Sequence, residues 1–264
     1  MGGSENHFLT RFAKWVVDLV VTLLLWGYYT VGFLVFFSPF YVIRYFFSRN
    51  REMSFQQLNH KFYKGFFFLV RVLIPKHKWR IDSDVSGIRS CVIVCNHLSY
   101  LDPLILISLF EKHKTIAKSS LFNIPLFGRM LKLSGYIPST AEGRFKELMI
   151  QHVETMNDFL AAGGNLFIFP EGTRSRDGTI GSLNMGAFKI ARLCKASIKV
   201  LFIRKTDALF RPGRFLFNTF VSNTITLELL QTMEPDYQNK AFSISGLMGQ
   251  VHTLLSTQNL RHSL

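Results

Sequence analysis

The chain has 264 residues, which is long enough for one α/β domain with an additional segment and for a sizeable hydrophobic core. Charged residues make up only 18% of it, hydrophobic residues reach 48% and 27 residues are Phe, so we expect part of the chain to contact lipid. The net charge of +14 suits anionic partners such as nucleic acid, an anionic membrane or phosphorylated substrates, and the odd, sparse count of three Cys argues against a disulfide scaffold and fits a reducing compartment.

The first predicted element is an apolar segment at residues 19–43, which holds 25 consecutive uncharged residues. A helix of roughly 20 apolar residues spans a bilayer, so this segment is long enough to do so. A signal peptide is not expected, because the run is too long and no small-residue cleavage site follows it. Gly27, Gly32 and Pro39 interrupt the run, which leaves open two shorter helices that dip into one leaflet and return. A buried helix pair of a soluble protein is a third alternative.

Basic residues flank this segment unequally. Arg11 and Lys14 precede it, whereas residues 44–80 hold nine basic residues and one acid, Glu52. The positive-inside rule therefore predicts a membrane protein whose C-terminal bulk lies on the cytoplasmic face, at the inner membrane if the source is bacterial.

The stretch HKFYKGFFFLVRVLI, at residues 60–74, predicts a basic amphipathic helix. Lys61, Lys64 and Arg71 lie on one face of that helix, and apolar residues such as Phe62 lie on another. Such a helix suits an anionic membrane surface. A helix packed on the domain with a solvated basic edge is an equally consistent interpretation.

From residue 80 onward, apolar runs alternate with helical periodicity, which indicates α/β layers around a sheet. Strands are expected at 91–95, 114–119, 165–169 and 197–203, helices at 103–113, 142–160 and 183–195, a strand pair at 215–221 and 224–230, and a weak helix from 243. The expected fold class is therefore α/β, with a mixed, mostly buried sheet flanked by helices and an N-terminal hydrophobic membrane-anchoring helical segment. The expected parts are a hydrophobic membrane segment at 1–50, a basic amphipathic connector at 51–79 and an α/β domain at 80–264.

The stretch CVIVCNHLSYLDP, at residues 91–103, is a buried strand that ends on an Asn-His pair and is followed by an Asp. His97 can act as a general base near neutral pH, and a carboxylate such as that of Asp102 can fix its tautomer and stabilise the imidazolium. The spacing alone is weak evidence, because His77 and Asp82 repeat it without an apolar strand to deliver them. His97 follows a buried strand, which is where α/β proteins place ligands.

Two other interpretations of this stretch stay open. Ser99 and Asp102 have the spacing of a capping-box variant, and Asp-Pro commonly starts a helix. Cys91, Cys95 and His97 suggest a metal site, but both cysteines lie on one face of an apolar strand and no second ligand pair follows. We therefore expect no metal.

The stretch NLFIFPEGTRSRDG, at residues 165–178, repeats this architecture, because an apolar strand again leads into a polar loop. Gly172 permits close approach of the backbone. Thr173 offers a hydroxyl, and Arg174 offers a guanidinium suited to phosphate. In isolation, a strand-to-helix loop with solvated arginines explains the stretch equally well.

Together, NHLSYLD and FPEGTRS resemble two signature blocks of the glycerolipid acyltransferase family, which includes the 1-acylglycerol-3-phosphate acyltransferases. The order of the blocks and their separation of about seventy residues match, and the resemblance covers roughly residues 80–215. It implies that His97 deprotonates a glycerol hydroxyl and that Asp102 orients His97. The hydroxyl would then attack the thioester of an acyl-CoA or an acyl-carrier protein, without a covalent enzyme intermediate.

The resemblance also implies a substrate site. Glu171 and Gly172 would shape the acceptor pocket, Arg174 would hold the acceptor phosphate, and Thr173 and Lys118 are further candidates for binding. No bound cofactor is implied, since the acyl-CoA or acyl-carrier protein is a co-substrate. The expected partners are membrane lipids, a lysophospholipid acceptor and the acyl donor, and no nucleic acid, because no RNA- or DNA-binding module is present.

Two features depart from the family pattern. The family normally has an Arg six residues after the position of Gly135, where this chain has Ala141, and Arg144 is the candidate substitute. Lys199 and Phe202 stand at the positions where the family usually has Pro. The resemblance implies 1-acylglycerol-3-phosphate as acceptor, giving phosphatidic acid. The missing Arg is the reason for the alternative, which is another lysolipid. A non-catalytic membrane protein that binds anionic lipid is the alternative of a different class.

Overall fold

The computed structural model describes residues 2–140, 146–175 and 178–261. It contains a seven-stranded sheet in the order β1-β7-β6-β2-β5-β3-β4. The strands are β1 (His77–Ile81), β2 (Cys91–Cys95), β3 (His113–Ala117), β4 (Ile137–Pro138), β5 (Asn165–Ile168), β6 (Ile198–Arg204) and β7 (Asn223–Met233). Neighbouring strands are parallel except β6 and β7, which pair antiparallel. The expectation of a mixed α/β sheet is confirmed.

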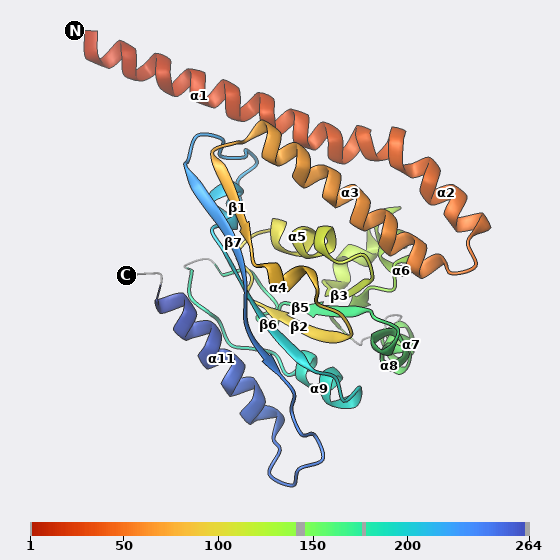
Figure 1. The fold of residues 1–264 in the computed structure, drawn as a ribbon. Helices are drawn as coiled ribbons and strands as arrows, with labels where there is room; N and C mark the ends of the chain where they lie inside the picture. The colour runs from red at the N-terminus through yellow and green to blue at the C-terminus, as the bar shows by residue number, and fades with distance from the viewer. Residues whose placement is uncertain (1, 141–145, 176–177, 262–264) are drawn as a thin grey trace.

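Helices cover both faces of this sheet (Figure 1). They are α1 (Gly2–Gly27), the π-helix η1 (Tyr28–Phe37), α2 (Ser38–Phe47), α3 (Arg51–Leu73), α4 (Ser83–Ser86), α5 (Leu101–Leu109), the 3₁₀ helix η2 (Ser119–Asn123), α6 (Phe127–Leu133), α7 (Lys146–Glu154), α8 (Met156–Ala161), α9 (Gly186–Leu193), α10 (Thr206–Leu209) and α11 (Ile244–Leu260). The central strand β2 is buried along its whole length, as expected for an uninterrupted apolar run covered on both faces.

Alternate residues of β2 belong to two separate apolar cores. Cys91, Ile93 and Cys95 pack with the buried faces of α3 and α5. Val92 and Val94 pack with residues of α8, α9 and α11. Successive side chains of a strand point to opposite faces, so five residues of sequence contribute to both layers and hold β2 at the centre.

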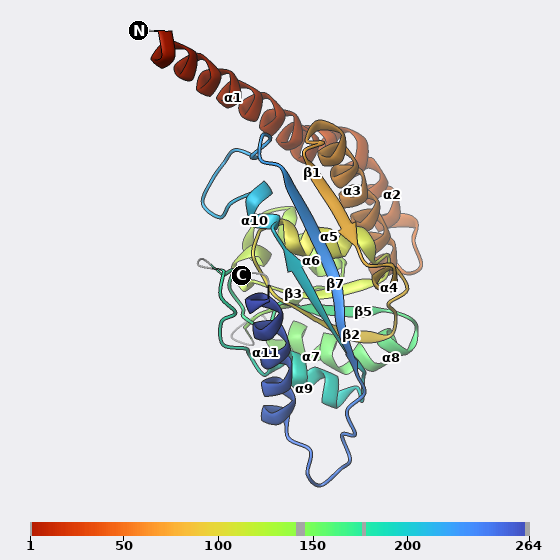
Figure 2. The same ribbon diagram turned by 60° about the vertical axis from the view of Figure 1, so that its left-hand side comes forward.

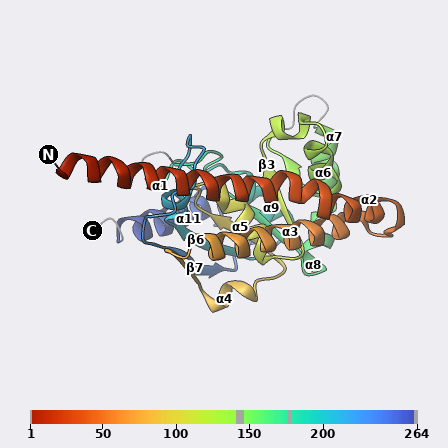
Figure 3. The same cartoon turned by 90° about the horizontal axis from the view of Figure 1, so that it is seen from above.

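The N-terminal helices form a layer outside α3. The segments α1, η1 and α2 make one bent helical run, and the chain reverses only after Phe47, so that α3 runs back along it (Figures 1 and 3). Tyr28 stacks on Phe62 at 5.1 Å between ring centroids and donates a hydrogen bond to its carbonyl oxygen. The stretch His7–Phe47 is long and apolar enough to cross a membrane. Its glycines and Pro39 therefore accompany a bend, and do not produce two helices that dip and return.

Helix α3 is packed on the domain and leaves a basic edge in solvent, which is the second of the two interpretations of its sequence. The side chain of Asn50 caps its N-terminus by accepting from Met53 N at 2.9 Å. Phe62 and Phe66 are buried in the core shared with α5, whereas Lys61 is exposed.

Some elements differ from the sequence expectation. The helix expected at 142–160 is divided between α7 and α8, with residues 142–145 outside the described part of the chain. The strand expected at 215–221 is wrong, because this segment forms a loop that packs against α1. The strand expected at 224–230 lies within β7, but it pairs with β1 and β6 and not with a strand at 215–221.

Strand β1 was not expected at all, because its sequence HKWRI has no apolar run. It is an edge strand in which Lys78 and Arg80 are exposed, and a single buried face suffices to hold it. The sheet therefore begins at His77, three residues before the expected start of the α/β domain.

A buried polar network joins α3 to β3 and β4. Tyr41 donates to Asn59 Oδ1 at 2.6 Å, and Asn59 Nδ2 donates to the Tyr136 hydroxyl at 3.2 Å. His113 Nδ1 lies 2.7 Å from the carbonyl oxygen of Phe110, which can only accept, so Nδ1 carries the hydrogen. Its Nε2 accepts from Tyr136, also at 2.7 Å. Burial lowers the pKa of His113 to about 3, and the network holds the neutral imidazole.

We expect His113 to make the fold sensitive to acid. Because its folded pKa lies below the ordinary value of 6.5, the unfolded chain binds the proton first as the pH falls below 6.5. The free energy of unfolding then drops by up to about 1.4 kcal/mol per pH unit for this group. Urea unfolding of the wild type and of His113→Gln, at pH 7 and pH 5 in the same detergent, tests this.

The variant should be less stable at pH 7 but should lose less stability on acidification. His60 and His77, whose pKa values burial also lowers, remain in both proteins and serve as an internal reference. An equal loss of stability in the two proteins contradicts the prediction.

Candidate active site

The candidate residues lie in the segments at the carboxyl ends of the parallel strands. Strands β3, β5, β2 and β6 are parallel, so their carboxyl ends lie together (Figure 2). Val94 of β2 pairs with Ile168 of β5, and Cys95 pairs with Leu201 of β6. The residues that follow these strands therefore meet, including both sequence blocks.

Asp102 and His97 are in direct contact. His97 Nδ1 lies 2.9 Å from Asp102 Oδ2, and the same oxygen accepts from the backbone N–H of Leu98 at 2.6 Å and of Ser99 at 2.7 Å. Asp102 is fully buried, whereas the His97 side chain is 15% exposed. Because an ionised carboxylate only accepts, Nδ1 donates to it, and Nε2 is left as the basic nitrogen of His97.

The capping interpretation and the pairing with His97 describe the same carboxylate. Helix α5 begins at Leu101 after the N-cap residue Tyr100, and Asp102 in its first turn reaches back to the N–H of Ser99, one residue before that cap. The pair His77 and Asp82 behaves differently. They lie at the two ends of β1, roughly 16 Å apart for a strand of that length.

The second block is bonded to the backbone of His97. Glu171 Oε1 accepts from His97 N at 2.9 Å, and its Oε2 accepts from Gly181 N at 3.1 Å. Ser175 N donates to the His97 carbonyl at 2.9 Å. The Phe169 ring stacks on the imidazole with centroids 4.3 Å apart. Burial raises the pKa of Glu171, and the two N–H bonds counteract part of that effect.

The loop after Glu171 turns sharply. Gly172 has φ +69°, a conformation that favours glycine, and a Cβ there would lie 3.1 Å from Asn184 Nδ2. Thr173 is exposed. The Arg174 guanidinium lies 3.3 Å above the centroid of the Tyr100 ring. Its Nη1 is buried and has no hydrogen-bond partner among the described residues, so it is a donor available to an anion.

The other predicted residues are only partly placed. Lys118 is exposed directly after β3, at the same sheet edge as His97. Arg144 and Ala141 lie outside the described residues. In the described part of the chain, no three His, Cys, Asp or Glu side chains are arranged to hold a metal ion. Burial raises the pKa of the Cys91 thiol to about 12, so the thiolate that metals bind is disfavoured there.

Sequence reasoning missed three residues of this site. Phe169 and Tyr100 stand inside the two blocks, and their aromatic character beside a His and an Arg was a usable signal. Thr206 donates to Asp102 Oδ1 at 2.6 Å from a position 104 residues later in the chain, and nothing in its local sequence marks it.

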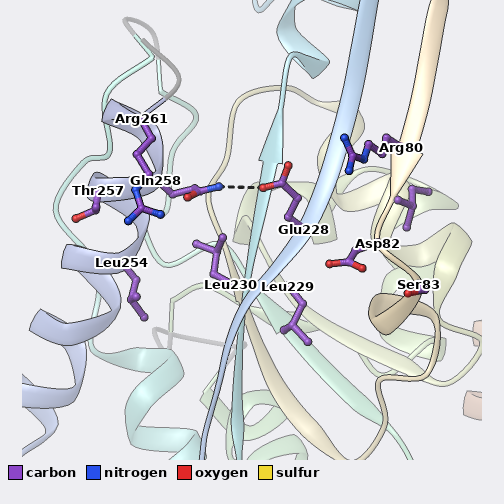
Figure 4. A pocket seen from close by; sticks show the side chains of 11 residues that line it. Arg80, Asp82, Ser83, Glu228, Leu229, Leu230, Leu254, Thr257, Gln258 and Arg261 are labelled. Atoms are coloured by element: carbon purple, nitrogen blue, oxygen red, sulfur yellow. Dashed lines mark hydrogen bonds between the residues drawn. The ribbon is translucent and has the colours of Figure 1, made fainter. Parts of the chain in front are cut away.

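A groove of about 590 Å³ lies elsewhere, against β1, β7 and α11 (Figure 4). None of the predicted site residues lines it. Glu228 in this groove already accepts from Gln258 Nε2 at 2.9 Å and lies 3.4 Å from Arg204 Nη2. The groove holds no base paired with an orienting carboxylate, so we place the candidate site at His97.

Residues 78–203 match the family model described as Acyltransferase, and this stretch holds both blocks. This stretch of the chain is similar to the acyltransferase family. A chloroplast 1-acyl-sn-glycerol-3-phosphate acyltransferase of Brassica napus is 34% identical over 116 residues, which make up 41% of this chain and 33% of the relative. A chloroplast protein of the same description from Arabidopsis thaliana is 32% identical over 122 residues, 46% of this chain and 34% of the relative. The chain thus spans about a third of the length of these relatives.

A solved structure supports the fold over nearly the whole chain. The crystal structure of the 1-acyl-sn-glycerophosphate acyltransferase PlsC from Thermotoga maritima matches with a TM-score of 0.70 and 22% identity. The match covers 95% of this chain and 98% of that chain, so the N-terminal helices are part of the shared architecture.

The Glu171 contacts predict that this side chain stabilises the site. Glu171→Ala removes both N–H bonds and should lower the free energy of unfolding by about 1.5–3 kcal/mol for each lost bond to the carboxylate. Part of this loss is offset, because the variant no longer holds a charged group out of water. Glu171→Gln keeps an amide oxygen for one of the two donors and should lose less. The midpoint of thermal unfolding in detergent should therefore fall in the order wild type, Gln, Ala.

The exposed Glu111→Ala serves as the matched control and should melt like the wild type. If Glu171→Ala also melts like the wild type, the two bonds do not hold the loop.

Proposed function

We propose that this protein transfers an acyl group from an acyl thioester to the free hydroxyl of a lysophospholipid, with 1-acylglycerol-3-phosphate as acceptor and phosphatidic acid as product. The observation that carries the proposal is the buried Asp102 carboxylate bonded to His97 Nδ1. Beside it lies a loop in which Arg174 Nη1 has no hydrogen-bond partner among the described residues. The match of residues 78–203 to the acyltransferase family model and the names of the relatives support this proposal.

In the proposed reaction, His97 Nε2 takes the proton of the acceptor hydroxyl as the hydroxyl oxygen attacks the thioester carbonyl carbon. Asp102 accepts from Nδ1 and stabilises the imidazolium that forms. The carbon–sulfur bond then breaks, and the thiol of the acyl-CoA or acyl-carrier protein leaves with the proton from His97. The proposed reaction needs no bound cofactor and forms no acyl-enzyme.

The acceptor phosphate would be bound by Arg174, with Lys118 and Arg144 as further cations. The stacking on Tyr100 fixes the Arg174 guanidinium while leaving its Nη1 without a partner among the described residues, as a phosphate site requires. The net charge of +14 favours such an anionic substrate. The described hydrogen bonds of Glu171 come from backbone N–H groups, so its proposed role is to position His97 and the loop near the acceptor.

The substrates are lipids, and the N-terminal helical run supplies a surface for them. It exposes large apolar side chains that include Phe8, Phe12, Trp15, Leu24, Val35, Phe36, Phe40 and Phe47. Its C-terminal part packs on the protein through Trp26, Tyr28 and Tyr41, so lipid cannot surround that part, whereas residues 7–15 are exposed. A helix with one lipid-facing and one protein-facing side suits the membrane interface, and we propose that the catalytic domain lies there on the cytoplasmic face.

Thioester-dependent acyl transfer is the decisive measurement. The purified protein is incubated with a panel of lysolipids and of acyl-CoA and acyl-carrier protein thioesters, and the products are identified by mass spectrometry. We expect phosphatidic acid from 1-acylglycerol-3-phosphate. His97→Ala should lower the rate by about 10²- to 10⁴-fold, because the general base is lost.

The same variant separates the enzyme from a non-catalytic protein that binds anionic lipid. Sedimentation with anionic vesicles should be unchanged in His97→Ala. If the wild type acylates no lysolipid on the panel but still binds vesicles, the enzyme proposal fails and the binding protein is the better account.

The Arg174 contact predicts head-group selectivity. Arg174→Ala should raise KM about 10- to 100-fold for 1-acylglycerol-3-phosphate, because a charge-assisted bond to phosphate is lost. A monoacylglycerol, which lacks the phosphate, should show no such change. Arg192→Ala is the matched control, since Arg192 is exposed on α9 with its guanidinium over Phe242.

Arg144→Ala should raise KM in the same way only if Arg144 replaces the family arginine that is absent at Ala141. An unchanged KM removes Arg144 from the site, and an unchanged KM in Arg174→Ala removes Arg174.

A further inference from the structure

We propose that Thr206 is a positioning residue of the catalytic pair, and that its hydroxyl holds the Asp102 carboxylate in the orientation that serves His97. This inference rests on the proposed acyl transfer with His97 as base. Thr206 belongs to neither sequence block and follows β6 at the start of α10.

The hydrogen bonds of Asp102 are divided unequally between its two oxygens. Oδ2 accepts from three groups, namely His97 Nδ1, Leu98 N and Ser99 N. Oδ1 accepts from the Thr206 hydroxyl at 2.6 Å, and both side chains are fully buried. A buried carboxylate oxygen without a donor is costly, so the Thr206 hydroxyl satisfies the half of Asp102 that the His97 loop does not reach.

The fold fixes Thr206 against Asp102 from two sides. Before it, Asn96 bonds through its side-chain amide to both the N–H and the carbonyl of Ile203, at 2.8 and 2.9 Å, and so ties the end of β2 to β6. After it, the Phe210 carbonyl accepts from Ser99 Oγ at 2.9 Å. The segment that carries Thr206 is therefore bonded to the His97 loop at both of its ends.

The turn that delivers Thr206 is itself constrained. Lys205 adopts φ +60°, in the left-handed region that non-glycine residues rarely occupy. Its carbonyl accepts from Asn223 Nδ2 at 2.8 Å, which anchors the turn to β7. This strained conformation directs the next residue back over the sheet edge toward Asp102.

Loss of the hydroxyl should act on His97 through Asp102. Without a donor on Oδ1, the carboxylate is held only through Oδ2, and more of its negative charge is directed at the His97 proton. The titratable groups around Asp102 are His97, Glu171 and Cys95, and burial keeps the Cys95 pKa well above its ordinary value. The imidazolium should then persist to higher pH, and the neutral base that the reaction needs should be scarcer.

Two variants separate the hydroxyl from the packing of the side chain. Thr206→Val keeps the shape but removes the hydroxyl, and it should lower kcat about 10- to 100-fold with KM for both substrates unchanged. The acid limb of its kcat/KM profile should move to higher pH. Thr206→Ser keeps the hydroxyl and should retain kcat within about threefold and the wild-type pH profile.

Thr115→Val is the matched control. Thr115 is also buried in the sheet, but its hydroxyl makes only a 3.5 Å contact with Ile116 O, so its loss should leave the kinetics unchanged. Thermal unfolding of each variant in the same detergent reports whether it is folded. In an Asp102→Asn background, Thr206→Val should lower kcat almost no further, because both changes act on the same contact.

The inference is overturned if Thr206→Val keeps the wild-type kcat and pH profile, or if Thr206→Ser is as impaired as Thr206→Val. It is also overturned if Thr206→Val lowers kcat by the same factor in the Asp102→Asn background as in the wild type. These outcomes all require an active wild type. A wild type that acylates no lysolipid instead contradicts the proposed function, so the two failures are distinct.

Discussion

The fully buried carboxylate of Asp102 is the constraint on which the rest of the site depends. Removing a charge from water costs several kcal/mol unless its oxygens are satisfied, so the surrounding chain must bring donors to it. His97 Nδ1 and two backbone N–H groups reach one oxygen, and Thr206 reaches the other. Asp102 also stands in the first turn of α5, where the helix dipole favours negative charge. Stability and the orientation of His97 thus come from the same contacts.

Parallel pairing explains why two blocks about seventy residues apart form one site. The register of β2 with β5 brings Val94 beside Ile168, so the residues that follow each strand emerge side by side. Glu171 and Ser175 then bond the backbone of His97 on its N–H and its carbonyl. Because these bonds involve the main chain, the second block fixes the position of His97 without bonding the nitrogens of its imidazole.

Much of the fold and the two blocks could be predicted because a strand buried on both faces has a continuous apolar sequence, as β2 does. The edge strand β1 has no such run, and residues 215–221 have apolar residues because they pack on α1, so local pattern misled in both places. The two interpretations of Asp102 do not exclude each other, since one carboxylate oxygen bonds both the backbone N–H groups before α5 and the imidazole of His97. Thr206 could not be found at all, because its partner is 104 residues away in sequence.

The segment between β6 and β7 links the apolar helix α1 to the pair His97 and Asp102. Asp18, the acid directly before the uncharged run, accepts from Thr219 N at 2.9 Å, so its charge is satisfied at the boundary of an apolar helix. The Trp26 ring contacts Phe210 at 6.1 Å between centroids, and the Phe210 carbonyl accepts from Ser99. Thr206 lies in the same segment. The segment that carries the donor to Asp102 Oδ1 therefore also contacts α1, so the apolar helix and the site are held by the same part of the chain.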